Sequence, residues 1–110
     1  MKGTVVIGDK KVEVVANAAS PYLYKGVFHE DFLIEVQKSN PSTDLFVKMG
    51  FIMAMQAAKS RQDVQNLNID DFYDWLEEFD AMDILLATDA LSNVYFDQTK
   101  GTAAPKVEAG

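Results

Sequence analysis

Residues 43–60 read TDLFVKMGFIMAMQAAKS, and as a helix this segment would be apolar on nearly every side. One apolar stripe would consist of Leu45, Met49, Ile52 and Met53, and a second of Val47, Phe51, Ala54 and Ala58. A helix without a polar face is buried, either at the centre of a core or within an oligomer. We therefore expect this helix to organise the fold. The oligomer alternative predicts a self-association surface made of Phe46, Met49, Phe51 and Met53.

Short elements precede and follow this helix. Alternating strands flank Gly8 and Asp9, which suit a tight turn, so we expect a β-hairpin at residues 3–16. Ser20 and Asn68 are suitable N-caps of two further helices. The expected helices cover about residues 20–28, 30–38, 43–60, 68–79 and 81–98. The sequence thus predicts a mainly α fold with a small N-terminal β-hairpin (α+β), as one compact domain of four to five helices over residues 1–99, with a flexible tail at 100–110.

The composition predicts a soluble intracellular protein. The chain has 110 residues, 48% of them apolar, and no cysteine, which suits one domain that folds without disulfides. No apolar run approaches the roughly 20 residues that span a bilayer, and no signal-peptide core precedes the first strand. We therefore expect a cytoplasmic location and no membrane partner.

Charge is distributed unevenly along the chain. Between Gln62 and Thr99 there are ten acidic residues and no Lys or Arg, and the whole chain has a net charge of −7. Such acidity disfavours nucleic acid as a partner and favours basic or amphipathic proteins. An alternative is that the acidic residues only keep the protein soluble. The composition leaves open both this interpretation and the binding of a basic or amphipathic protein.

Large apolar side chains lie among these acids on the helix expected at residues 68–79. One face, expected to lie on the core, would consist of Ile69, Phe72, Tyr73, Leu76 and Phe79. Trp75 would lie beside that face, either as a half-exposed anchor for a partner helix or packed over the hairpin. We predict a partner-binding site made of Phe72, Tyr73, Trp75, Leu76 and Phe79.

Residue patterns typical of catalysis are missing. With no Cys and a single His, His29, the chain lacks the residue types of a nucleophilic triad. The acids do not have the glycine-centred spacing of a calcium loop, and the glycines do not form a phosphate-binding loop. We therefore expect a binding protein rather than an enzyme, with no cofactor and no metal.

Several segments follow one another in a distinctive order: a hairpin turn at Gly8 and Asp9, AASPYLYK at residues 18–25, FHED at 28–31, an Ala- and Met-rich helix, and FYDWLEEF at 72–79. This order resembles the tail assembly chaperones of long-tailed phages and related prophages, over about residues 3–96. The chain departs from that family where a Gly would be expected before the acidic residue and His29 stands instead.

The resemblance implies a non-catalytic protein that coats the tape measure protein, keeps it soluble and helps recruit tail tube subunits. It also implies self-association into spirals or rings, action in the host bacterial cytoplasm and absence from the mature virion. Two alternatives stay open at this point. One alternative to the chaperone is an acidic adaptor or inhibitor that masks a basic partner, and the other is a minor structural phage protein.

Overall fold

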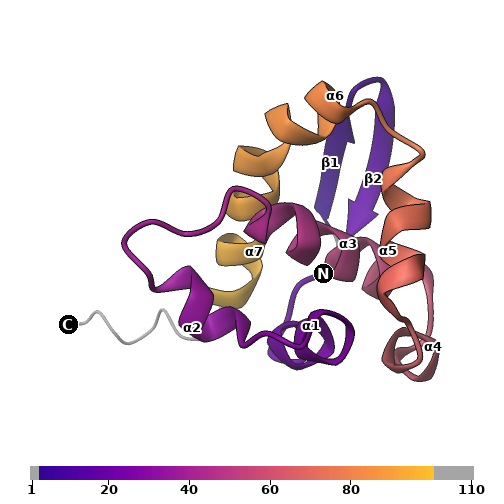
Figure 1. Cartoon of the computed structure of the whole chain (residues 1–110). Coiled ribbons are helices and arrows are strands. Elements are labelled where there is room, and N and C mark those ends of the chain that lie inside the picture. Colours follow the sequence, from indigo (N-terminus) through magenta and orange to yellow (C-terminus); the bar gives the residue numbers. More distant parts are fainter. Residues whose placement is uncertain (1–2, 101–110) are drawn as a thin grey trace.

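The computed structural model describes residues 3–100, and Figure 1 shows its elements. Two strands, β1 (Gly3–Ile7) and β2 (Lys10–Val14), come first. The helices in these residues are α1 (Ser20–Phe28), α2 (Phe32–Val36), α3 (Leu45–Ala58), α4 (Arg61–Gln65), α5 (Ile69–Leu76), α6 (Ala81–Leu86) and α7 (Thr88–Lys100). The mainly α fold with a small hairpin is confirmed, with seven helices in this part of the chain rather than four to five. Lys100 closes α7, and the rest of the predicted tail lies outside the described residues.

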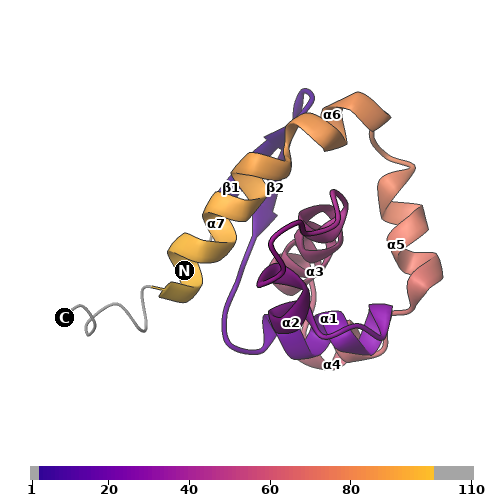
Figure 2. The ribbon, with the colours of Figure 1, turned by 60° about the vertical axis from the view of Figure 1, so that its left-hand side comes forward.

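α3 is the central element of the fold. Figures 1 and 2 show it surrounded by the hairpin and α7, by α5 and α6, and by the group of α1, α2 and α4. Its buried residues are Leu45, Val47, Met49, Gly50, Phe51, Ile52, Met53 and Ala54. Because apolar area removed from water is the main favourable contribution to folding, this helix contributes heavily to the core. The segment without a polar face is therefore at the centre of the monomer.

The hairpin packs on α3 through one face. β1 and β2 pair antiparallel, with Val5 opposite Val12, and Gly8 in the turn has a φ of 66°. Val5 and Val14 are buried, and the backbone N–H of Val15 donates to the carbonyl of Met53 over 3.0 Å. Two strands alone are marginal in water, and this contact with α3 supplies the support that they need.

The α1 to α2 connection follows the sequence signals in part. Ala19, and not Ser20, occupies the N-cap position of α1. Ser20 is instead fully buried, and its hydroxyl donates to Oε1 of Gln56 over 2.6 Å. The expected break at His29 is confirmed, because His29 ends α1 in the left-handed conformation with φ 57° and ψ 34°. The side chain of Asp31 then caps α2, which is shorter than the expected helix at residues 30–38.

The second half of the chain contains more breaks than the sequence predicts. Ser60 accepts a hydrogen bond from the N–H of Asp63 and so begins α4, a helix that was not expected. The helix expected at residues 81–98 is two helices, which meet at Ala87. There the hydroxyl of Thr88 donates to the carbonyl of Leu85 over 2.9 Å, and no Pro or Gly marks the position.

Alanine substitutions at two helical glycines test the packing of α7 on α3. In Gly50→Ala the new Cβ would lie 2.8 Å from Cδ1 of Leu91, which is fully buried on α7. Overpacking of this kind costs about 1–3 kcal/mol, which outweighs a gain in helix propensity of about 1 kcal/mol. We therefore expect a lower free energy of unfolding, measured by urea denaturation.

Gly26→Ala is the matched control. Gly26 is exposed on α1, and a Cβ there meets nothing within 4 Å. We expect this substitution to raise the free energy of unfolding by about 0.5–1 kcal/mol. Stabilisation by both substitutions would contradict the close approach of α7 to α3.

Candidate partner-binding groove

The orientation of α5 decides which apolar side chains reach the surface. Phe72 and Trp75 point into the core, whereas Ile69 and Tyr73 are 41% and 54% exposed. The prediction that Ile69 and Tyr73 lie on the core with Trp75 beside them is therefore wrong. The helix is rotated, so that the face with Phe72, Trp75 and Phe79 packs inwards and the face with Ile69, Tyr73 and Leu76 borders the surface.

Trp75 is a core residue. Its side chain is 6% exposed, and its ring centroid lies 5.8 Å from that of Phe51 and 5.1 Å from that of Phe79. It also borders a surface hollow that hairpin residues Lys10 and Val12 line. Of the two interpretations of Trp75, the half-exposed partner anchor is contradicted, because the ring is buried against Phe51 and Phe79.

The start of α5 is fixed by a reciprocal cap, as the sequence indicates. The side chain of Asn68 accepts from the N–H groups of Asp70 and Asp71 over 2.9 and 3.3 Å. The carboxylate of Asp71 accepts in return from the N–H of Asn68 over 2.9 Å. This capping box satisfies otherwise unpaired N–H groups and so defines where α5 begins.

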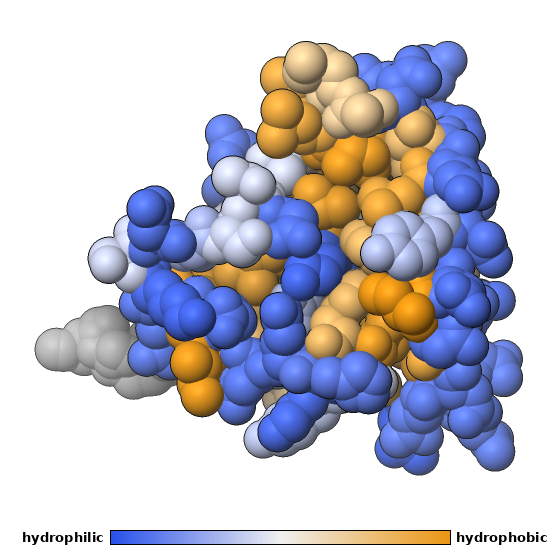
Figure 3. Space-filling model, in the orientation of Figure 1, coloured by the Kyte–Doolittle hydropathy of each residue, from blue (hydrophilic) through white to orange (hydrophobic). Residues whose placement is uncertain are grey.

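Two surface hollows meet beside α5. One, of about 620 Å³, lies against the N-terminal part of α5, and the other, of about 560 Å³, lies against its C-terminal part. Asp44, Phe72 and Tyr73 line both, so the two hollows form one groove along the helix, the α5 groove. Its apolar lining includes Phe28, Val47, Leu67, Ile69, Phe72, Tyr73, Leu76, Phe79, Ile84 and Leu85. In Figure 3 apolar surface runs down from α6 along the inner side of α5.

α6 adds further apolar surface at one end of the groove. Leu85 lines the groove, and Met82 and Leu86 are 61% and 74% exposed. Single exposed apolar residues are ordinary, but a continuous patch next to a hollow is typical of an interaction site. The groove and α6 together are therefore the candidate partner-binding surface.

Acidic residues border this surface along α5. Asp70 and Asp74 lie on α5 and Glu77 is its C-cap residue, and all three are exposed. The hydrophilic right-hand edge in Figure 3 follows α5. Because no Lys or Arg occurs from Gln62 to Thr99, this border has a negative potential that favours cationic partners.

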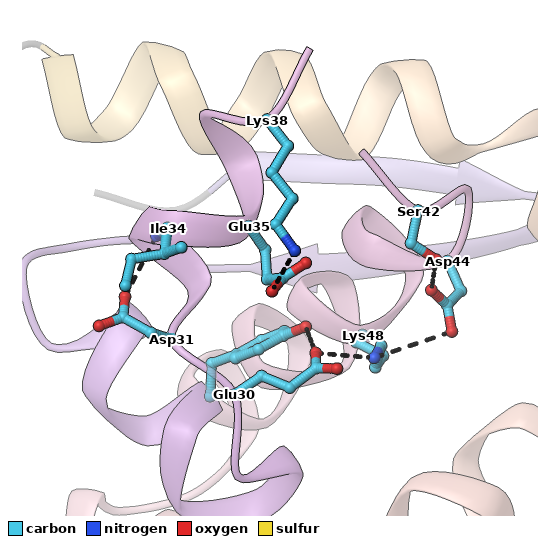
Figure 4. Close-up of polar contacts among 9 residues, drawn as sticks. Glu30, Asp31, Ile34, Glu35, Lys38, Ser42, Asp44 and Lys48 are labelled. Carbon is cyan, nitrogen blue, oxygen red and sulfur yellow. Dashed lines mark hydrogen bonds and ion pairs between the residues drawn. The ribbon is translucent and has the colours of Figure 1, made fainter. Parts of the chain in front are cut away.

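The wall of the groove opposite α5 is formed by the end of α1 and the start of α3. It contains a basic residue, Lys48 (Figure 4). Its Nζ lies 3.0 Å from Oε1 of Glu30 and 3.8 Å from Oδ2 of Asp44. The hydroxyl of Tyr24 donates to the same Glu30 oxygen over 2.8 Å. Hydrogen bonds from Lys48 and Tyr24 lower the pKa of Glu30, and burial together with the bond to Glu30 raises the pKa of Tyr24. The network connects the segment after α1 to the start of α3 and so holds this wall in position.

The structure brings together four of the five predicted partner-binding residues. Phe72, Tyr73, Leu76 and Phe79 line the groove, while Trp75 supports it from the core. Sequence reasoning missed Val47, Ile84 and Leu85, which come from α3 and α6. The one sequence feature that pointed to this surface is the apolar group Met82, Leu85 and Leu86. These three residues are exposed in the structure, and they are more apolar than a surface helix requires.

The predicted self-association surface requires correction. Met49, Phe51 and Met53 are completely buried within the monomer, so their side chains have no surface to offer a second chain. Phe46 is partly buried and its ring packs against those of Phe32, Tyr95 and Phe96. The prediction fails because the hairpin and the other helices of the same chain surround α3 and cover these side chains.

No family model, curated protein or solved structure matches this chain. Within residues 3–100, no group of three or more His, Cys, Asp or Glu side chains is arranged to hold a metal ion. None of the helices in this part of the chain has the length and apolarity to cross a membrane. The α5 groove and its charges are therefore the features on which a functional proposal rests.

Substitutions at two neighbouring aromatic residues separate core from surface. Trp75→Ala removes a buried ring, so we expect it to lower the free energy of unfolding by about 3–5 kcal/mol. Tyr73→Ala removes an exposed ring, so we expect a change within about 1 kcal/mol. Urea denaturation followed by far-UV circular dichroism measures both. Comparable losses from the two substitutions would contradict the orientation of α5.

The ionisation of Glu30 gives a test at acid pH. Its pKa is lower in the folded state than the ordinary value of 4.5, so the carboxylate form stabilises the fold. That stabilisation is fully present above the unfolded-state pKa and is lost as the pH falls through the lowered folded-state pKa. Between about pH 5 and about pH 3, we therefore expect the free energy of unfolding to fall less steeply in Glu30→Gln than in the wild type.

Glu77→Gln is the control for this titration, since Glu77 is exposed at the end of α5. It removes an exposed carboxyl group that does not belong to the network of Glu30, Lys48 and Tyr24, so a change confined to Glu30→Gln identifies that network. An unchanged pH dependence in Glu30→Gln would show that the contacts of Glu30 with Lys48 and Tyr24 do not stabilise the fold.

Proposed function

We propose that this protein is a phage tail assembly chaperone that binds the tape measure protein, keeps it soluble and helps recruit tail tube subunits. It acts in the host bacterial cytoplasm and leaves before the virion is complete. The resemblance in sequence supplies the identity of the partners. The observation that supports a chaperone role is the apolar α5 groove with acidic residues along its border.

A groove of this kind suits a long helical client. A tape measure protein is amphipathic, and its apolar stripe causes aggregation while it is uncovered. The apolar lining of the groove, which includes Phe72, Leu76 and Leu85, provides a place for such a stripe. The acids then face water, and the net charge of −7 keeps coated chains apart in solution.

Self-association belongs to this proposal, on a different surface from the one that the sequence indicates. Exposed apolar side chains on α6, Met82 and Leu86, are suited to contact a neighbouring copy beside the groove. Because Met49, Phe51 and Met53 are buried, they contribute to the core and not to the contact between copies.

A second candidate function follows from the charge. The acid-only stretch from Gln62 to Thr99 favours an adaptor or inhibitor that masks a basic protein. Binding through exposed charges alone weakens steeply as salt rises, whereas apolar capture tolerates salt. The salt dependence of binding therefore separates the two functions. Presence in purified virions would instead identify a minor structural protein.

Co-expression with the longest helical tail protein encoded nearby tests the proposal. We expect this chain to raise the soluble fraction of that protein and to co-purify with it at high salt. Leu85→Glu introduces a charge into the lining of the groove, so we expect it to abolish both effects while the variant itself stays folded, because Leu85 is exposed.

Leu33→Glu is the matched control, since Leu33 is a similarly exposed leucine on α2, outside the lining of the groove. It should behave like the wild type. No rescue by the wild-type chain, or equal loss in both variants, would exclude a chaperone that acts through this groove.

A further inference from the structure

The charges beside the α5 groove differ from one wall to the other. We infer that the occupant is a single amphipathic helix with its basic residues on one flank of its apolar stripe, and that this flank fixes the direction in which the helix lies. The inference rests on the proposed function, because it states the chemistry of the partner that the groove receives.

The wall made by α5 favours a helix over an extended peptide. A strand gains affinity by pairing its backbone with a free sheet edge. The backbone N–H and C=O groups of α5 are used within the helix, so this wall offers side chains only. A helix brings its own backbone pairing and needs only an apolar stripe, with residues spaced by three or four positions, to fill the hollows on either side of Tyr73.

Three acids lie along the α5 wall, on the solvent side of the residues that line the groove. Asp70, Asp74 and Glu77 follow the spacing i, i+4 and i+7, so they form one stripe that extends about 10 Å along the helix. Asp70 and Glu77 come one position after Ile69 and Leu76, which places them about 100° further around α5, on the solvent side of the lining. All three acids are exposed, and their helix contains no Lys or Arg.

The opposite wall is closer to neutral. Asp44 and Lys48 line the groove there, and both Asp44 and the adjacent Glu30 lie within 4 Å of the ammonium group of Lys48. Lys48 thus offsets part of the negative charge on this side, whereas the stripe of Asp70, Asp74 and Glu77 includes no basic residue. A helix with Lys or Arg on one flank therefore gains more when that flank faces α5.

This difference between the walls has a directional consequence. Turning a helix end over end in the groove, with its apolar stripe still facing down, exchanges its two flanks. A helix with bases on one flank thus has one preferred direction, and moving the bases to the other flank reverses that direction. Exposed ion pairs are individually weak, and three of them together give a preference of about tenfold.

Two peptides of about 14 residues test the inference, because a helix of that length is about 21 Å long and exceeds the eight residues of α5. Both have the same leucine stripe, and they differ in the flank that carries lysine. Each has a nitroxide on an N-terminal cysteine, a clean label because the protein contains no cysteine. Paramagnetic broadening of the backbone N–H signals of Ile69 and Ala81 reports the direction, since these residues begin α5 and α6.

We expect one peptide to broaden the signal of Ile69 and the other that of Ala81. Neutralising the α5 acids in D70N/D74N/E77Q should weaken the binding of both peptides about tenfold and remove the directional difference. The control D63N/E78Q/D97N changes the net charge equally at exposed acids outside the stripe of Asp70, Asp74 and Glu77, and it should keep affinity within about twofold and retain the direction.

Two results would overturn the inference while leaving a helix-binding groove intact. Binding of both peptides in the same direction would show that the acids do not orient the helix. Equal weakening by the two triple variants would show that only overall charge matters. If neither peptide, nor a leucine-stripe peptide without lysine, shifts the signals of groove residues, then the proposed function fails together with the inference.

Discussion

The packing of Phe51 against α5 is the contact on which the candidate site depends. The ring of Phe51 on α3 lies 5.4 Å from that of Phe72 and 5.8 Å from that of Trp75, centroid to centroid. Phe28 of α1 completes the group, 4.9 Å from Phe72 in an edge-on arrangement that aromatic rings favour. These contacts fix the rotation of α5, and the rotation directs Ile69, Tyr73 and Leu76 towards the groove and Asp70 and Glu77 towards water.

The sequence predicts the parts of this fold that local chemistry decides. The hairpin turn at Gly8, the break at His29 and the cap at Asn68 each follow from what those residues do to the backbone. The burial of α3 follows from the lack of any polar face. The orientation of α5 does not follow, because its apolar residues span an arc of about 160° around the helix axis, with Trp75 in one half of that arc and Ile69 and Tyr73 in the other. Either half can face inwards, and the choice belongs to Phe51, which is far away in the sequence.

The groove also depends on a bend that the sequence does not mark. α6 and α7 form one apolar pattern with no Pro or Gly at Ala87, yet the chain turns there. The bend allows α7 to pack Leu91 against Gly50 while α6 extends over the end of the groove with Leu85. The tight fit of Leu91 on Gly50 is a tertiary constraint, so local propensity cannot reveal it. The sequence likewise shows that acidic residues accompany the apolar residues of α5. It does not show that they lie along one wall of the groove, because the other wall comes from distant segments of the chain.

Chemical-shift mapping with a basic amphipathic peptide tests the central claim, that the α5 groove is the surface that receives a helix. The ¹⁵N-labelled protein would be titrated with a peptide of about four turns that carries one leucine stripe. The account predicts that shifts concentrate in α5, α6 and the first turns of α3, and that they persist at high salt. Shifts spread over the acidic residues without the lining of the groove, or centred on α1 and α2, would contradict it.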